Sequence, residues 1–211
     1  MGAHELHIIS TGRQPIEKFI NIATKIQDDV DYFHLREKQM TASQLYQAVT
    51  LLHQKNVPRS KIIINDRVDV AWAQMVSGVQ LGYQSLDTKI VKQAFPGIRT
   101  GKSVHSFQEA KEAEQNGADY VIYGHIFQTK SKPNIPPKGV KKLRDITMNV
   151  NLPVIAIGGI TPANCDAVLK AGARGIAVMS GVLEAENPIQ AVKEYCKILK
   201  KGGYDGNSHF K

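Results

Sequence analysis

The feature of this sequence that most restricts its fold is a regular alternation of short apolar runs with longer amphipathic stretches. Eight runs have the composition and alternation of short strands: 5–10, 31–36, 61–65, 78–82, 98–104, 119–124, 153–158 and 175–180. The stretches that follow them have apolar residues three and four apart, as helices do: 15–29, 41–55, 67–77, 87–95, 106–117, 137–149, 161–172 and 188–201. Eight strand–helix units in 211 residues predict an α/β fold, a single closed (β/α)8 TIM barrel.

The main alternative is an open, doubly wound sheet. Such a sheet usually has fewer strands, and its dinucleotide-binding form shows G-x-G-x-x-G directly after the first strand. Here the first strand is followed by STGRQP, which lacks that spacing. The barrel is therefore the better prediction.

One domain accounts for nearly the whole chain. We expect residues 1–202 to form the catalytic barrel and residues 203–211, which have no periodicity, to form a flexible C-terminal tail. No apolar run is long enough to span a membrane, and the N-terminus lacks the features of a signal peptide. Two isolated cysteines, Cys165 and Cys196, suit a reducing compartment, so we expect a cytoplasmic protein.

The net charge is +8, but the basic residues are spread along the chain and are not interleaved with exposed aromatics. We therefore expect no nucleic-acid partner. A basic surface does favour small phosphorylated anions as ligands.

Polar residues and glycines follow the predicted strands, at the end of a barrel where active sites lie. Candidate substrate-binding residues are Arg36, Lys38, Asn65 and Ser103. His125 follows a glycine at the end of the sixth strand, where a histidine can transfer protons near pH 7. Each has a structural alternative: the two cations could pair with Glu37, Asn65 could cap a helix, Ser103 could simply fill the barrel, and a lone histidine is often structural.

A phosphate site is predicted after the last two strands. Barrels commonly hold phosphate there, on backbone N–H groups and a short extra helix. The residues expected to form it are Gly158, Gly159, Ser180 and Gly181. Strand alternation places Arg36 on one face with His34, and His125 on one face with Tyr123, but it does not say which face lies inside the barrel.

The segments HLREK, IIND, GVQLG, SVHS, DYVIYGHIF, PVIAIGGI and GIAVMSG, taken in order, resemble the thiamin phosphate synthase superfamily. The resemblance runs from Leu6 to about Leu199. Within the superfamily the chain looks most like the TenI branch, the thiazole tautomerases. The synthases of this superfamily join a hydroxymethylpyrimidine pyrophosphate to a thiazole phosphate with Mg²⁺, and the resemblance places Arg36, Lys38, Asn65 and Asp66 where they bind pyrophosphate and metal.

Two departures favour the tautomerase branch. Where the synthases read H-L-G-Q-x-D, residues 80–85 read QLGYQS, so Ser85 replaces an acidic metal ligand. Where they read G-P-I-F-x-T-x-T-K, residues 124–132 read GHIFQTKSK, so His125 replaces a proline and Ser131 a threonine. The tautomerases have a histidine at that position, where it is taken as the proton-transfer residue.

The resemblance thus implies an isomerase of thiamin biosynthesis. Its substrate would be the unaromatised carboxy-methyl-thiazolylidene ethyl phosphate, and His125 would move a proton from ring C2 to the exocyclic carbon. No cofactor and no metal would be needed, the partner would be a small phosphorylated thiazole, and the expected assembly is a homodimer. Two alternatives stay open: a Mg²⁺-dependent thiamin phosphate synthase, and a non-catalytic regulatory barrel that binds a thiazole or thiamin phosphate.

Overall fold

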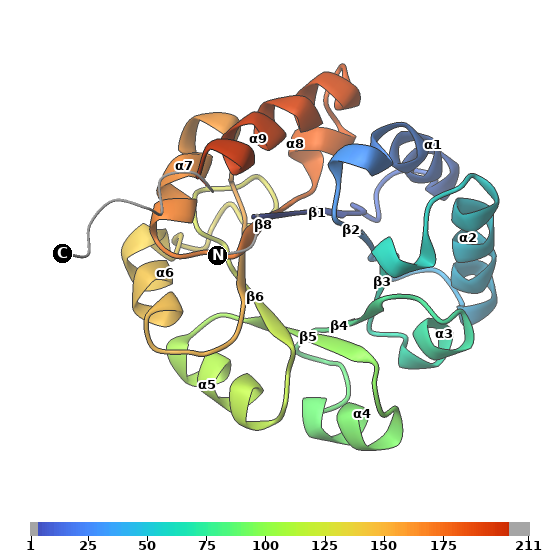
Figure 1. Cartoon of the computed structure of the whole chain (residues 1–211), viewed down its shortest axis with the longest axis horizontal. Coiled ribbons are helices and arrows are strands. Elements are labelled where there is room, and N and C mark those ends of the chain that lie inside the picture. The colour runs from blue at the N-terminus through green and yellow to red at the C-terminus, as the bar shows by residue number, and fades with distance from the viewer. Residues whose placement is uncertain (1–3, 203–211) are drawn as a thin grey trace.

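The strands form a closed parallel barrel in the computed structural model, which describes residues 4–202. Each strand pairs with the next along the chain, and β8 pairs with β1 to close the ring. Figure 1 looks along the barrel and shows the strands inside a ring of helices. The strands are β1 (Glu5–Ile9), β2 (Tyr32–Leu35), β3 (Ile62–Asn65), β4 (Gly78–Leu81), β5 (Arg99–Val104), β6 (Tyr120–Gly124), β7 (Val154–Ile157) and β8 (Gly175–Val178).

The helices follow the strands in the order that the sequence predicts. They are α1 (Ile16–Ile26), α2 (Ala42–Gln54), α3 (Val68–Ala73), α4 (Thr88–Ala94), α5 (Phe107–Gln115), α6 (Gly139–Thr147), α7 (Pro162–Lys170), α8 (Ser180–Leu183) and α9 (Pro188–Gly202), with short 3₁₀ turns η1 (Gln27–Asp29) and η2 (Arg59–Lys61). The TIM-barrel prediction is confirmed. Within residues 4–202, no helix has the length and apolar character needed to cross a membrane. The predicted tail, 203–211, lies outside the described residues.

Local signals explain why several helices begin where they do. At α2, Thr41 and Gln44 form a capping box, in which each side chain accepts a hydrogen bond from the other residue's backbone N–H. At α5, the Ser106 hydroxyl accepts a hydrogen bond from the N–H of Glu109. These caps satisfy N–H groups that the helix itself leaves free.

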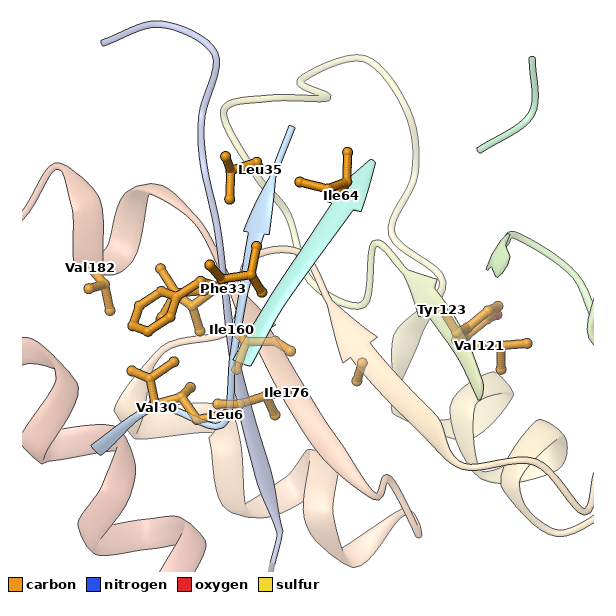
Figure 2. Packing of buried hydrophobic residues seen from close by; sticks show 14 of the residues in the cluster. Leu6, Val30, Phe33, Leu35, Ile64, Val121, Tyr123, Ile160, Ile176 and Val182 are labelled. Carbon is orange, nitrogen blue, oxygen red and sulfur yellow. The ribbon is translucent and has the colours of Figure 1, made fainter. Parts of the chain in front are cut away.

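Strand alternation separates an outer apolar layer from the barrel interior. The outer faces of the strands carry the larger core, which packs against the helices; Figure 2 shows part of it, with Phe33 of β2 lying toward Val182 of α8. The interior holds a smaller apolar cluster: Ile9, Ile63, Tyr120, Ile122, Ile155 and Ala177. Arg36 continues the inner face of β2, because Phe33 and Leu35 belong to the outer layer.

The floor of the barrel interior is polar and charged. Fully buried His7 lies between Glu5, whose Oε2 is 3.1 Å from its Nε2, and His34, whose Nε2 is 2.9 Å from its Nδ1. Arg174 Nε donates to Glu5 Oε1 at 3.2 Å. The Arg99 guanidinium lies over the rings of Tyr32 and Tyr120, with its carbon 4.4 and 4.5 Å from their centroids.

These contacts change the proton affinities of the floor residues. Burial would raise the pKa of Glu5, but hydrogen bonds from His7 and Arg174 and the charge of Arg99 lower it to about 2. Burial lowers the pKa of His7, although Glu5 opposes this effect. Burial, then the neighbouring His7 ring and the charge of Arg99, lowers the pKa of His34 well below its usual value. At neutral pH the floor therefore combines an ionised carboxylate with two neutral imidazoles.

This floor predicts loss of stability in mild acid. Both histidines have a lower pKa in the folded state than in the unfolded chain, so the unfolded chain takes up protons that the barrel does not. Their contribution is full above about pH 6.5, and below it the free energy of unfolding should fall by at most about 1.4 kcal/mol per pH unit for each histidine, until the folded-state pKa of that histidine is reached. Urea unfolding between about pH 7.5 and pH 5.5 measures this slope. His34→Gln should reduce it, and an unchanged slope in that variant would contradict the assignment.

Candidate active site

Arg36 and Lys38 lie at the carboxyl end of β2. The N–H of Arg36 donates to Ser10 Oγ at 2.8 Å, and the N–H of Ser10 donates to the carbonyl of His34 at 2.9 Å. The start of the β1–α1 loop therefore holds the end of β2 in place. Neither Arg36 nor Lys38 forms an ion pair within residues 4–202, so the predicted alternative, pairing with Glu37, does not occur. Arg36 is half-buried on the inner face and Lys38 is exposed.

Asn65 and Asp66 lie at the end of β3. Asn65 points into the barrel, and its Oδ1 is buried without a hydrogen-bond partner. Asp66 is exposed and has a left-handed backbone, with φ of +67°. The neighbouring Arg67 pairs with Asp69, through an Nε–Oδ1 contact of 2.9 Å, rather than with Asp66. The carboxylate of Asp66 is thus available at the rim.

The ends of β4 and β5 place Ser103 beside Gln80. Gln80 Nε2 donates to Ser103 Oγ at 3.0 Å across the inner faces of these strands. Ser85 accepts a hydrogen bond from the N–H of Gly82 at 2.8 Å, so it shapes the β4–α4 turn. Gln80 is a site residue that the sequence interpretation did not select; its signal was a polar residue on the inner face of a buried strand.

The rim offers a divalent cation few protein ligands. Among the described residues, no group of three or more histidines, cysteines or carboxylates is placed to hold a metal ion. Asp66 provides one exposed carboxylate, next in sequence to the amide side chain of Asn65. Because Mg²⁺ is commonly bound by one or two carboxylates, several waters and the phosphates of a substrate, this donor set fits Mg²⁺ that arrives with a polyphosphate.

His125 follows β6 and is 4 % exposed. Its Nε2 is 3.0 Å from the carbonyl oxygen of Ile135, ten residues further on. Val121 and Tyr123 belong to the outer layer (Figure 2), so the face of β6 that alternation assigns to His125 is the outer one. The N–H of Lys138 also donates to the His125 carbonyl at 2.8 Å. The ring and backbone of His125 therefore hold the β6–α6 loop.

Gly158 and Gly159 follow β7 and contact that same loop. Both have positive φ, +97° and +65°. A Cβ on Gly158 would lie 2.2 Å from the Cβ of His125, and one on Gly159 would lie 2.4 Å from the carbonyl oxygen of Gln128. The glycines are needed for close approach of two loops. A charged side chain at Gly159 would disturb this contact as well as any phosphate site.

Ser180 and Gly181 begin α8 and are exposed. The first N–H groups of a helix have no partner within the helix, and those of α8 lie at the rim because the helix begins two residues after the end of β8. The β1–α1 loop lies beside this turn, because Gln14 Nε2 donates to the carbonyl of Leu183 at 3.3 Å and Arg13 pairs with Glu184 at 2.6 Å. The loops after β1, β7 and β8 thus border one part of the rim.

A closed (β/α)8 barrel with free cations, amides and glycine turns at its C-terminal rim is the type of barrel that holds small phosphorylated ligands. The chain belongs to the thiamine monophosphate synthase family, which matches residues 6–182. It is 35% identical to the thiamine-phosphate synthase of Pyrococcus furiosus over 198 residues, covering 93% of this chain and 95% of that protein. It is 39% identical to the synthase of Chlorobium limicola, covering 92% of each.

A solved structure agrees with these relatives. The thiamine phosphate pyrophosphorylase from Pyrococcus furiosus superposes with a TM-score of 0.80 and 32% identity, covering 94% of this chain and 96% of that one. The similarity thus extends through the whole barrel and its order of strands.

These relatives correct the function expected from the sequence. The prediction of a thiazole tautomerase, and with it an isomerase, is wrong, because whole-length relatives are named thiamine-phosphate synthases, which are transferases. That prediction depended on two loop positions, Ser85 and His125. Two substitutions alter local contacts, whereas the similarity to the synthases covers more than nine-tenths of the chain.

Proposed function

We propose that this protein is a thiamin phosphate synthase. It would join a hydroxymethylpyrimidine pyrophosphate to a thiazole phosphate. The bond between the pyrimidine methylene carbon and the pyrophosphate oxygen breaks, and a bond forms between that carbon and the thiazole nitrogen. The electron pair of the broken bond leaves with pyrophosphate, so the reaction needs no redox partner. The observation that carries the proposal is the whole-length similarity to curated synthases.

The two cations that follow β2, Arg36 and Lys38, support the proposed transferase activity. Pyrophosphate gains negative charge as the carbon–oxygen bond breaks, and groups that meet this charge stabilise the transition state. Arg36 lies on the inner face at the rim and, like Lys38, has no competing ion pair among the described residues. We assign these two side chains to the pyrophosphate, and Asn65 and Ser103 to the bound substrates.

The glycine turns after β7 and at the start of α8 suit the second phosphate. Gly158, Gly159, Ser180 and Gly181 offer backbone N–H groups, which bind a phosphate without a charged side chain. We assign them to the thiazole phosphate. Two separate anion sites would hold the two substrates with their reacting atoms facing each other, which lowers the entropic part of the barrier.

Asp66 is the residue that would hold Mg²⁺. Mg²⁺ bound to pyrophosphate neutralises its charge and so makes it a better leaving group. The exposed carboxylate, held by a left-handed backbone at the end of β3, would receive the ion together with the substrate. His125 is assigned a positioning role, because its buried ring contacts the Ile135 carbonyl and supports the β6–α6 loop.

The decisive experiment incubates the protein with both substrates and Mg²⁺. We expect thiamin phosphate and pyrophosphate to form in equal amounts, detected by liquid chromatography with mass detection. Removing Mg²⁺ with a chelator should abolish product, and Asp66→Asn should raise the Mg²⁺ concentration needed for half-maximal rate. Tight binding of either substrate without any product would contradict the synthase and favour the non-catalytic barrel.

Two further expectations stay proposals. A cytoplasmic location is supported by the two cysteines, Cys165 and Cys196, which are both free and buried. A homodimer is supported by exposed apolar side chains on neighbouring helices, Trp72 of α3, Ile90 of α4 and Tyr46 of α2.

A further inference from the structure

The buried histidines of the barrel floor form a chain of hydrogen bonds whose direction can be worked out atom by atom. The Glu5 carboxylate can only accept, so His7 Nε2, 3.1 Å away, carries its proton. His7 is neutral, so its Nδ1 has a lone pair, and His34 Nε2 must donate to it across 2.9 Å. Neutral His34 then has no proton on Nδ1. The chain thus runs in one direction, with Glu5 as its final acceptor.

Asn65 meets the other end of this chain. Its side chain interacts with the His34 ring, yet His34 Nδ1 and Asn65 Oδ1 are both buried and both lack a hydrogen-bond partner. Two acceptors cannot bond to each other, and leaving both unsatisfied costs free energy. Rotating the amide of Asn65 by 180° exchanges its oxygen and nitrogen, so that Nδ2 donates to His34 Nδ1.

We propose that Glu5, His7 and His34 are positioning residues that hold Asn65 with its amide oxygen toward the substrates. Asn65 is half-exposed at the rim, between Arg36, which follows β2, and Gln80 on β4. In this orientation it accepts a hydrogen bond from a ligand. The donor is either the amino group of the pyrimidine or a water bound to Mg²⁺. Its role in catalysis rests on the proposed synthase function, whereas the direction of the chain does not.

Glu5→Gln should reverse the direction of the chain. Arg174 can only donate, and it bonds Oε1 of Glu5 at 3.2 Å, whereas Arg99 Nη2 is 3.8 Å from Oε2, beyond hydrogen-bond distance; the oxygen of a glutamine should therefore stay with Arg174. The glutamine NH₂ then faces His7 and makes His7 Nε2 an acceptor. His7 Nδ1 donates to His34 Nε2, and His34 Nδ1 donates to the oxygen of Asn65. The amide of Asn65 would then turn its NH₂ toward the substrates.

The test reads the ring protons directly. In protein labelled with ¹⁵N-histidine, NMR of the ligand-free wild type should show the rings of His7 and His34 protonated on Nε2 and unprotonated on Nδ1. Glu5→Gln should exchange these positions in both rings. The matched control is Asp31→Asn, which removes an exposed carboxylate that accepts from the N–H of Leu6 and lies outside the chain of hydrogen bonds; it should leave both rings unchanged. A wild-type His34 protonated on Nδ1 would overturn the proposal without any variant.

Kinetics test the orientation of Asn65. If its oxygen accepts from the pyrimidine, Glu5→Gln should raise the KM for the pyrimidine pyrophosphate about tenfold or more and leave that for the thiazole phosphate unchanged. If it accepts from water on Mg²⁺, the half-saturating Mg²⁺ concentration should rise instead. Reversed rings with both quantities unchanged would overturn the role of Asn65. If wild type forms no thiamin phosphate, the proposed function fails, and the NMR result still decides the direction of the chain.

Discussion

Arg36→Ala is expected to lower kcat/KM for thiamin phosphate formation by about 10²–10³-fold. Arg36 is on the inner face of β2, fixed through Ser10, and no carboxylate in residues 4–202 competes for it. Its guanidinium should meet the charge that pyrophosphate gains as it leaves. Because this charge is largest in the transition state, kcat should fall more than KM rises. Steady-state rates at saturating Mg²⁺ measure both.

The matched control is Arg67→Ala. Arg67 also follows a barrel strand, but its guanidinium is already paired with Asp69. Its removal should change the rate less than about threefold, since an exposed pair contributes little. Similar losses in both variants would mean that Arg36 acts only through the general positive charge of the surface.

Gly158→Ala is expected to cost about 2–5 kcal/mol of unfolding free energy, or to prevent folding. The new Cβ would lie 2.2 Å from the Cβ of His125 and 2.7 Å from its Cα, so backbone must move. Overpacking of this kind costs about 1–3 kcal/mol, and the left-handed backbone adds about 1–2 kcal/mol. Urea unfolding at neutral pH measures the loss.

Gly97→Ala separates the cost of the left-handed backbone from the cost of overpacking. Gly97 has a similar φ of +87°, but a Cβ there meets nothing within 4 Å. It should therefore show only the backbone cost of about 1–2 kcal/mol. Equal losses at both positions would show that contact between the β6–α6 and β7–α7 loops is not tight.

Several site predictions could be made from the sequence because they depend on strand ends. Parallel barrel strands bring their carboxyl ends to one rim, so Arg36, Lys38, Asn65 and Ser103 could be grouped from their positions alone. Their assignment to substrates stays a prediction. Gln80 was missed, and the role of His34 stayed open, because a polar residue inside a strand does not show, from sequence alone, which side chain it will meet.

The function was misjudged for a related reason. The residues next to His125 in the sequence predict a proton-transfer role for it. Its partner is the carbonyl of Ile135, and its Cβ lies against Gly158, 33 positions away in the chain. These contacts decide whether a histidine can transfer protons at the barrel mouth or instead supports a loop.

The sequence by itself determined the elements, their order and the closed barrel, because hydrophobic periodicity and turn residues act over a few neighbouring positions. Only the tertiary structure decided which strand faces look inward. On β2 the face of His34 is inside, and on β6 the face of Tyr123 is outside. Alternation has two equivalent phases, and packing against helices selects one. The same packing brought His7 and His34, 27 residues apart, within 2.9 Å, and so created a chain of hydrogen bonds that no local pattern encodes.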